Sequence, residues 1–411
     1  MFSIKLGFKN LTRQKKRNII TAMVIAFAFF SYLFMDSMMN GMEEMSFENI
    51  KNLETGNIQI AYPDYWEEKE ELPLENLIYL DQDVEESLEN IDGLSGISPE
   101  LRFSANLNNG IDELPVMGLG IDPEHYKEVF TTGEYLVDDS MFSLGENKAV
   151  IGEKMAQLMD LKINDYITLL VRTKEDTFNT IDVEIAGLLH TPHPMVNAGT
   201  VFVPLDIAQQ ALNVGNSVSL IAVKVKPGYE ENITETLNQN FRRKDSNLRA
   251  YSWRESAETV IALSAAKKAG IGLILSVVLL IGIVGIINNV VLSALERTEE
   301  IGMMKALGMR EMEIVSVFMV EATGIGIIGS LVGCLLGAVG VGWLVKYGFD
   351  ISYAGDMTTY GIPILNKLYG VWNLSAFGFL FVLGIIVALL SSITPALWAA
   401  RKDPVKAIYH R

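Results

Sequence analysis

Residues 18–39 read NIITAMVIAFAFFSYLFMDSMM, an almost unbroken apolar run. A bilayer core about 30 Å thick requires about 20 apolar residues in helical form, so this run predicts a transmembrane helix. A cleaved secretory signal is the alternative interpretation. The run is longer than a signal core, and its only small-residue pattern, at Ala26 and Ala28, lies in mid-run. We therefore interpret it as a retained membrane anchor.

Three more apolar runs lie in the last third of the 411-residue chain and predict three more spans. The single cysteine, Cys334, falls within one of them, which excludes a disulfide framework and a cysteine-based zinc site. The predicted segments are an N-terminal segment at 1–17, spans at 18–42, 267–293, 314–346 and 373–399, a polar domain with stalk helices at 43–266, a helical connection at 294–313, a loop at 347–372 and a tail at 400–411.

Charge differs strongly between these segments. The net charge is −17, and the acidic residues are concentrated in the polar domain. The positive-inside rule therefore predicts both termini in the cytoplasm and the polar domain outside. Because the negative charge belongs to that external domain, it gives no indication of nucleic-acid binding. The basic residues that set this orientation are Lys5, Lys9, Arg13, Lys15, Lys16 and Arg17, then Arg297, Lys305 and Arg310, and finally Arg401, Lys402, Lys406 and Arg411.

The polar domain combines two kinds of pattern. Alternating apolar and polar residues are typical of half-buried strands, and short amphipathic stretches are typical of helices. Together they predict a mixed α+β domain. The predicted strands are 57–62, 166–171, 181–186 and 221–225, the predicted short helices are 152–159 and 205–212, and helices at 41–53 and 253–268 lead from and to the neighbouring spans.

No pattern for catalysis appears. The sequence has no phosphate-binding loop ending in Gly-Lys-Ser/Thr, no His-Glu-x-x-His motif and no nucleophile elbow. His190 and His193 flank a proline, but zinc needs three or four protein ligands, so we interpret them as ordinary loop histidines. We therefore expect no catalytic residue, no metal site and no cofactor bound by this chain.

Two acidic residues lie within the predicted spans, where charge is costly. Asp36 is near one end of its span and can reach the interface, whereas Glu321 lies deeper, so that it could form a cap, pair with a basic residue or transmit motion. The spans lack the series of acids and histidines that a proton relay needs. Gly329, Gly333 and Gly337 recur on one face of the third span, which predicts close helix packing within the bundle or at a subunit interface.

The connection between the second and third spans is the most informative segment. Residues 295–310 read LERTEEIGMMKALGMR, with Ile301, Met304 and Leu307 spaced for one helical face and Gly308 placed to end the helix. The segment is too polar to span a membrane. It is therefore either an interfacial helix or a helix that docks into a cytoplasmic partner.

Within this connection, residues 296–308, ERTEEIGMMKALG, resemble the coupling-helix motif of the FtsX-like permease family. These are ABC-transporter permeases of the macrolide-exporter (MacB-like) and lipoprotein-release (LolC/LolE-like) types. The resemblance implies a four-span α-helical protein of the bacterial inner membrane, with an inserted α+β domain of the MacB periplasmic core type. It extends in order along nearly the whole chain, through residues 6–11, 120–123, 150–154, 201–205, 321–322 and 395–407.

By this resemblance the chain is a non-catalytic half-transporter in contact with membrane lipid. The implied partners are a second permease, either the same chain or a paralogue, and two ABC ATPase subunits that bind the ATP and Mg²⁺. Closure of the ATPases would act through the coupling helix on the stalks of the first two spans and so move the periplasmic domain. The residues implied in ATPase coupling are Glu296, Arg297, Thr298, Glu299, Glu300, Ile301, Gly302, Met303, Lys305, Ala306, Leu307 and Gly308.

The resemblance leaves three functions open. Residues 40–42 and 54–60 resemble permeases that release lipoproteins, with an acyl-chain site expected near Phe34, Met35 and Met38. The alternatives are MacB-like export through a periplasmic adaptor or efflux of peptides, and FtsX-like regulation of a cell-wall hydrolase. The chaperone-binding hook of one lipoprotein-release subunit corresponds here only to the short, proline-free connection at 173–179, so we do not expect chaperone capture by a hook.

Overall fold

The computed structural model describes residues 7, 13, 15–81, 84, 88, 91–138, 141–351, 365 and 367–401. They form two compact units. The helical unit contains the described residues up to 43 together with 263–350 and 367–401, and the α/β unit is built on 44–262. The predicted lead-in at 6–11, except Gly7, and the tail from 402 onward lie outside the described residues.

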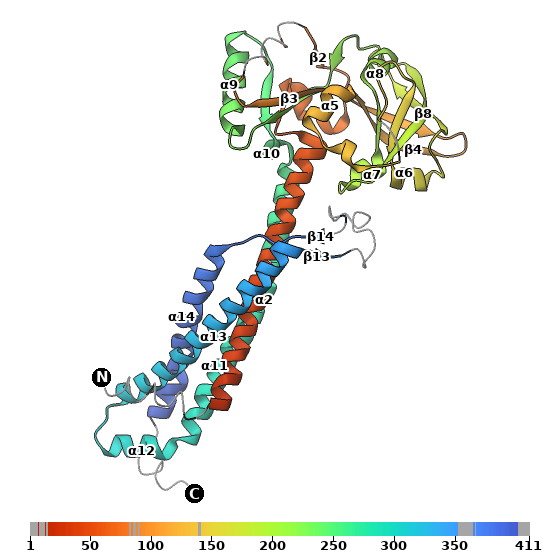
Figure 1. The fold of residues 1–411 in the computed structure, drawn as a ribbon. Coiled ribbons are helices and arrows are strands. Elements are labelled where there is room, and N and C mark those ends of the chain that lie inside the picture. The colour runs from red at the N-terminus through yellow and green to blue at the C-terminus, as the bar shows by residue number, and fades with distance from the viewer. Residues whose placement is uncertain are drawn as a thin grey trace. The chain divides into compact units, whose positions relative to one another are not determined.

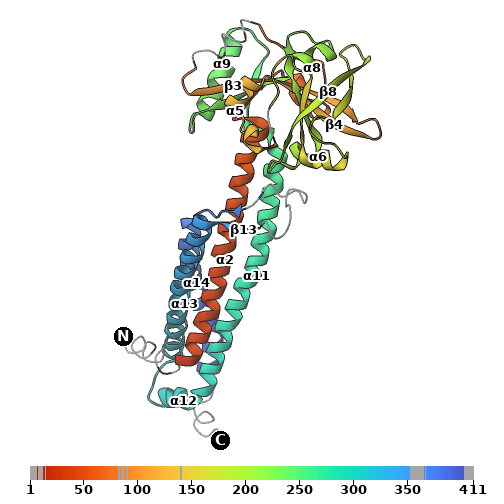
Figure 2. The ribbon, with the colours of Figure 1, turned by 45° about the vertical axis from the view of Figure 1, so that its right-hand side comes forward.

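Among the described residues, four helices are long and apolar enough to cross a membrane, which confirms the four predicted spans. Helices α2 and α11 lie side by side and antiparallel (Figures 1 and 2). Arg17 pairs with Glu296 at 2.8 Å near one end of this helix pair, and Glu43 pairs with Lys268 at 3.0 Å toward the other. The four helices are α2 (Lys15–Ile50), α11 (Glu258–Glu296), α13 (Glu311–Tyr347) and α14 (Leu374–Ala400).

The two predicted stalk helices differ in continuity. Beyond Ile50, α2 continues as a short π-helix, η1 (Lys51–Thr55), so the predicted helix at 41–53 is present. The predicted helix at 253–268 is interrupted at Ala257, which separates α10 (Trp253–Ser256) from α11.

Glycines let α13 approach α2 closely. A Cβ added at Gly329 would lie 3.0 Å from the carbonyl oxygen of Ala22, and one added at Gly333 would lie 2.9 Å from that of Ala26. Backbone atoms cannot yield as a flexible side chain can, so any larger residue would force the helices apart. The face that carries Gly329, Gly333 and Gly337 is therefore covered by α2 of the same chain.

The α/β unit is built on a ten-stranded sheet in which six strands close into a ring. Closure removes exposed strand edges from this part of the sheet. In ring order, the strands are β3 (Leu94–Asn108), β4 (Glu113–Ile121), β9 (Thr200–Pro204), β6 (Lys148–Gly152), β8 (Phe178–Leu189) and β7 (Tyr166–Arg172), and β7 pairs again with β3. Only β4–β9 and β6–β8 are parallel pairs within the ring.

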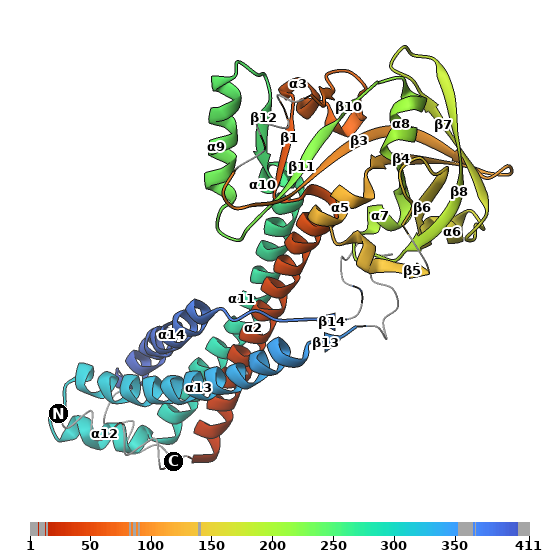
Figure 3. The same cartoon turned by 45° about the horizontal axis from the view of Figure 1, so that its top comes forward.

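Strand β3 also extends the sheet away from the ring. It pairs with β11 (Leu220–Val225), followed by β1 (Ile58–Ala61) and β12 (Arg249–Ser252), and α9 (Glu230–Arg243) packs on β12 (Figure 3). The other described elements are β5 (Leu136–Asp138), which pairs with β8, the pairs β2 (Ile78–Tyr79) with β10 (Ser217–Val218) and β13 (Phe349–Asp350) with β14 (Lys367–Leu368), and the helices α3 (Pro63–Glu67), η2 (Lys69–Glu71), α5 (Pro123–Val129), η3 (Thr132–Tyr135), α6 (Glu153–Leu158), α7 (Pro194–Gly199) and α8 (Leu205–Leu212).

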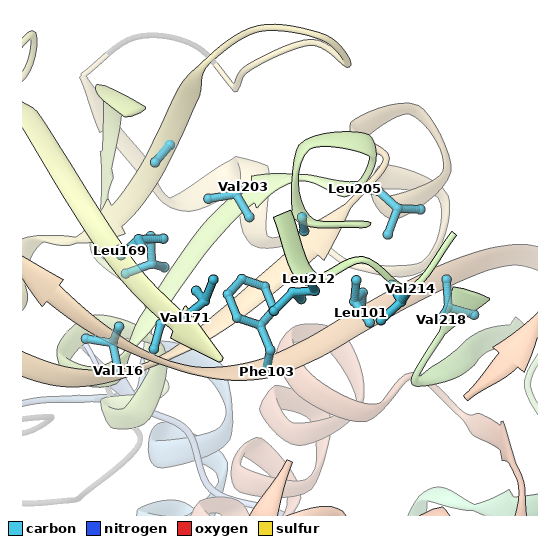
Figure 4. Close-up of a cluster of buried hydrophobic side chains, with 14 of the residues drawn as sticks. Leu101, Phe103, Val116, Leu169, Val171, Val203, Leu205, Leu212, Val214 and Val218 are labelled. Atoms are coloured by element: carbon cyan, nitrogen blue, oxygen red, sulfur yellow. The ribbon is translucent and has the colours of Figure 1, made fainter. Parts of the chain in front are cut away.

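Much of the hydrophobic core of the α/β unit is formed by the inner face of the ring (Figure 4). Phe103 on β3, Leu169 and Val171 on β7, and Val203 on β9 are all fully buried there. Helix α8 contacts β3, β4, β7, β8 and β9 and adds Leu212 to the same cluster. Burial of these large side chains supplies the main driving force for folding of this unit.

The predicted strands and short helices of this unit are confirmed, but β1 and, apart from Lys224, β11 are buried on both faces instead of half-buried. The alternation at 57–62 predicts a half-buried strand, but all four residues of β1 are buried. Strand β1 lies between β11 and β12, and Gln59, which is 2% exposed, belongs to the lining of a cavity. Alternation indicates that one face is polar, but it cannot distinguish solvent from a cavity.

We expect Gly333→Ala to destabilise the helical unit by about 1–3 kcal/mol, because the new methyl group overlaps the backbone of α2. Thermal unfolding of the full chain in mild detergent measures this. Gly378→Ala is the matched control, since a Cβ there meets nothing within 4 Å. Equal unfolding midpoints for the two variants would show that α13 does not need this close approach.

Candidate coupling site

A short helix, α12 (Thr298–Ala306), connects α11 to α13 at one end of the helical unit (Figure 1). Arg297 interrupts the preceding helix and stands at the N-cap of α12. At the other end, Gly308 has a φ of +89°, its N–H donates to Lys305 O, and the Met309 N–H donates to Met304 O. This pair of bonds is a Schellman motif, which needs glycine at its left-handed position. The predicted helix end at Gly308 is confirmed.

The two faces of α12 have different surroundings. Ile301 is buried, and Met304 packs against the core of the bundle. Leu307 was expected on the same face, but 86% of its surface is exposed, because it follows the last helical residue and no longer keeps the helical spacing. Together with Met303 and Met312, it forms an exposed apolar surface at this end of the unit.

A buried ion pair joins α12 to α13. The Arg297 guanidinium donates from Nη1 to Oε2 of Glu321 at 3.3 Å and from Nε to Oε2 of Glu300 at 2.7 Å. Ser293, in the last turn of α11, donates its hydroxyl to Oε1 of Glu321. The intramembrane carboxylate predicted from sequence is therefore paired with a basic residue, one of the roles left open for it. A buried charge of this kind is tolerated only when it is paired and hydrogen-bonded.

Further ion pairs link α12 and the end of α11 to the N-terminal part of the chain. Arg13 donates to Glu300 at 2.5 Å, and Arg17 donates to Glu296 at 2.8 Å. Burial alone would raise the pKa of the Glu300 carboxyl, but the hydrogen bonds and charges of Arg297 and Arg13 outweigh this and lower the pKa below its ordinary value. Glu300 is thus an anion at neutral pH, and it forms ion pairs with Arg297 and Arg13, which come from different segments of the chain.

The remaining residues of the predicted motif have local roles. The Thr298 hydroxyl donates to the carbonyl oxygens of Ala294 and Leu295, which ties the start of α12 to the end of α11. Lys305 lies 3.8 Å from Glu311. Gly302 is buried, whereas Glu299 and Ala306 are exposed.

An apolar cleft of about 260 Å³ lies between α2, α11 and α14. Its single polar side chain, Ser276, uses its hydroxyl to bond Gly272 O on the same helix. Phe34, Met35 and Met38, the predicted acyl-chain contacts, are half-buried and do not line the cleft. Phe34 instead stacks on Phe30 against α13. The cleft is lined by Ile25, Ala28, Phe29, Ser276, Leu279, Leu280, Gly282, Ile283, Ile286, Leu383, Gly384 and Val387.

Other polar residues that the sequence singles out are paired. Asp36 accepts hydrogen bonds from the side-chain amides of Asn40 and Asn373. His190 lies 2.9 Å from a carboxylate oxygen of Glu153. The connection at 173–179 is a tight turn between β7 and β8, closed by a hydrogen bond from Thr173 N–H to the carbonyl oxygen of residue 177.

Family models match two parts of the chain. The MacB-like periplasmic core domain model matches residues 19–239, and the FtsX-like permease C-terminal model matches residues 272–404. The second match covers α12 and the end of α11, where the ion pairs lie.

Similar proteins carry several names. An uncharacterised ABC transporter permease of Methanocaldococcus jannaschii is 20% identical over 98% of this chain and 97% of its own length. The macrolide export ATP-binding/permease protein MacB of Bartonella henselae is 23% identical over 97% of this chain, which spans only 58% of that protein. The lipoprotein-releasing system transmembrane protein LolC of Xylella fastidiosa is 23% identical over 77% of this chain and 78% of its own. Among solved structures, the periplasmic region of MacB from Actinobacillus actinomycetemcomitans aligns with 52% of this chain and 96% of its own, at 12% identity and a TM-score of 0.37.

We expect Arg297→Met to destabilise the helical unit by about 3–5 kcal/mol, because it leaves the Glu321 carboxylate buried without a cation. Thermal unfolding in detergent measures the change. Adding Glu321→Leu to the same chain should restore most of the stability, since no buried charge then remains. Arg249→Met, which breaks an exposed ion pair with Glu255, is the control and should change stability by less than about 1 kcal/mol. A stable Arg297→Met variant would contradict this account of the pair.

Proposed function

Since the chain belongs to the family of FtsX-like permeases with a MacB-like periplasmic core domain, and is thus an ABC transporter permease, we propose that it works with a separate ATPase chain and releases lipoproteins from the membrane. In this proposal the end of the bundle that carries α12 faces the cytoplasm, and the α/β unit lies outside. The basic residues near that end support this orientation.

The exposed apolar surface of α12 supports docking of an ATPase. Met303, on α12, and Leu307, directly after its last residue, are 53% and 86% exposed, although both are apolar. Exposed apolar groups rimmed by charged residues are typical of protein interfaces. A displacement of α12 would be transmitted to Glu321 through Arg297, and from Glu321 to α13 and to the end of α11.

The apolar cleft is the main observation in favour of a lipoprotein as the substrate. Its walls are hydrocarbon, and its one hydroxyl is already bonded within α11, so the cleft suits part of an acyl chain better than a polar drug. LolC of Xylella fastidiosa, named as part of a lipoprotein-releasing system, is among the similar proteins. The tight turn after β7 supports release without a hook for a chaperone.

Export of the MacB type, through a periplasmic adaptor or as peptide efflux, is the second candidate. It is favoured by the match of the periplasmic core domain model over more than half of the chain. Both candidates require the same ATPase contact at α12, and they differ in what the cleft holds. Regulation of a cell-wall hydrolase is a third candidate, carried only by the FtsX-like match.

Native mass spectrometry of the complex, purified from its own cells in mild detergent, tests the ATPase contact and the substrate together. We expect two ATPase chains, a second permease and a bound triacylated lipoprotein. Leu307→Asp should reduce ATPase retention at least tenfold, because it places a charge in a desolvated contact. Leu158→Asp, an equal change at an exposed leucine of α6, should retain it. A complex with an adaptor or a hydrolase and no lipoprotein would favour the alternatives.

We expect Gly282→Leu to block the cleft. A Cβ at Gly282 meets nothing within 4 Å, so the leucine side chain fills the cleft without disturbing the fold. ATP hydrolysis stimulated by added lipoprotein should fall about tenfold. Gly272→Leu is the matched control, because it lies on the same helix with equal free space but does not line the cleft. If Met38→Asp abolished stimulation and Gly282→Leu did not, the acyl chain would lie near Phe34, Met35 and Met38 instead.

A further inference from the structure

The α/β unit contains a second cavity, of about 330 Å³, that the proposed transport cycle does not use. It lies where the chain enters and leaves this unit, because Glu54 of η1 and Ser256 of α10 belong to its lining. Small-molecule sites in proteins occupy about 300–1,000 Å³ and combine apolar walls with a few charged or polar groups. Both components are present in the lining of this cavity.

Two pairs of charged side chains in the lining form within the α/β unit itself. Arg102 donates to Oε2 of Glu100 twice, from Nη2 at 2.7 Å and from Nε at 3.0 Å, and the Glu100 side chain is 1% exposed. Nε2 of His193 lies 2.9 Å from Oε2 of Glu54. Because these four side chains already have partners, no ligand is needed to compensate their burial.

Lys69 and Glu70, consecutive residues of η2, also line the cavity, and neither forms an ion pair with a described residue. Lys69 is half-buried, and its ammonium lies 3.7 Å from the centre of the Trp66 ring. Burial lowers the pKa of this ammonium below its ordinary value, because the charges of Glu70 and Glu54 offset the burial only in part. A carboxylate in direct contact with Lys69 would stabilise its charged form. Within the described part of the chain, these two residues therefore supply one cation and one anion that lack an ionic partner.

Apolar side chains make up much of the remaining lining. Leu119, Phe202 and Leu220 belong to it and are buried. Met195 also belongs to it but is 65% exposed, so the cavity reaches the surface of the unit beside this residue. A ligand can therefore enter from solvent and bury an apolar group against Leu119 and Phe202, which is favourable.

The two unpaired charges indicate the class of ligand. A neutral molecule would leave both Lys69 and Glu70 without an ionic partner, and a molecule with a single charge would leave one of them so. A zwitterion supplies a carboxylate for Lys69 and an ammonium for Glu70. In an α-amino acid these two groups are joined through one carbon, which suits partners that come from consecutive residues.

We propose that this cavity binds a zwitterionic α-amino acid with an apolar side chain. Its carboxylate accepts from the Lys69 ammonium, and its ammonium donates to the Glu70 carboxylate. Its side chain lies against Leu119 and Phe202. The lining includes residues of η1 and α10, the two segments that connect the α/β unit to α2 and α11. This inference does not depend on which substrate the transporter moves.

Isothermal titration calorimetry of the full chain in detergent, with L-phenylalanine as the ligand, tests the proposal. We expect saturable binding. Phenethylamine lacks the carboxylate and 3-phenylpropionate lacks the ammonium, so each should bind about tenfold more weakly or worse, because each leaves one charged side chain unpaired. Equal affinity for L-phenylalanine and either analogue would contradict the proposed pairing. Absence of L-phenylalanine binding to the unmodified chain would overturn the proposal.

Lys69→Met keeps the length of the side chain but removes its charge. It should weaken binding of L-phenylalanine about tenfold or more and leave binding of phenethylamine unchanged, because phenethylamine has no carboxylate. Lys127→Met on α5 is the matched control. Lys127 is exposed, pairs with Glu124 and does not line the cavity, so this variant should keep the original affinity for L-phenylalanine.

Glu70→Gln keeps the test decisive if Lys69→Met fails to fold. Glu70 is exposed, so this variant should retain the unfolding midpoint. It should weaken binding of L-phenylalanine about tenfold or more but not that of 3-phenylpropionate, which has no ammonium. Glu124→Gln, at an exposed glutamate outside the cavity, is its control. L-phenylalanine binding that survives both Lys69→Met and Glu70→Gln would overturn the proposal, because the amino acid would then lie elsewhere.

Discussion

The carboxylate of Glu321 sets the main constraint on the helical unit. An ion of this kind costs several kcal/mol when it is moved from water into an apolar interior, and only a well-placed counter-ion offsets this. Arg297 supplies that counter-ion from the N-cap of α12, so α12 must begin beside α13. Glu300 then occupies the other side of the guanidinium and accepts from Arg13 as well. The place of α12 against the bundle thus follows largely from one buried charge.

Packing among the spans is uneven. Helix α13 contacts α2 through its glycines, and Gly326 brings it equally close to Ala388 of α14. Among the described residues, α11 packs least against the other spans: only 17% of its most apolar stretch is buried, against 28% for α14 and 44% for α2 and α13. The same loose packing of α11 leaves room for the cleft beside Gly282. Helix α11 also leads directly into α12.

The α/β unit has a closed, well-packed part and a second part in which some buried polar groups lack hydrogen bonds. The closed ring of six strands has no free edge and a core of fully buried side chains around Phe103. The cavity beside Gln59 lies at the other side of β3, where polar groups are buried without full hydrogen bonding. Such groups are rare in folded proteins.

The sequence by itself determined the four spans, the helix end at Gly308, the strands of the α/β unit and the family motif, because each depends on a local pattern of polarity or backbone freedom. Only the tertiary structure decided the partner of Glu321, the covering of Gly329 and Gly333 by α2, the exposure of Leu307 and the cavity behind Gln59. The apolar cleft likewise needs three helices from distant parts of the chain, so residues near Phe34 gave no indication of it. Local periodicity records which side of an element is polar or apolar, whereas contacts between residues hundreds of positions apart are fixed by how the elements pack.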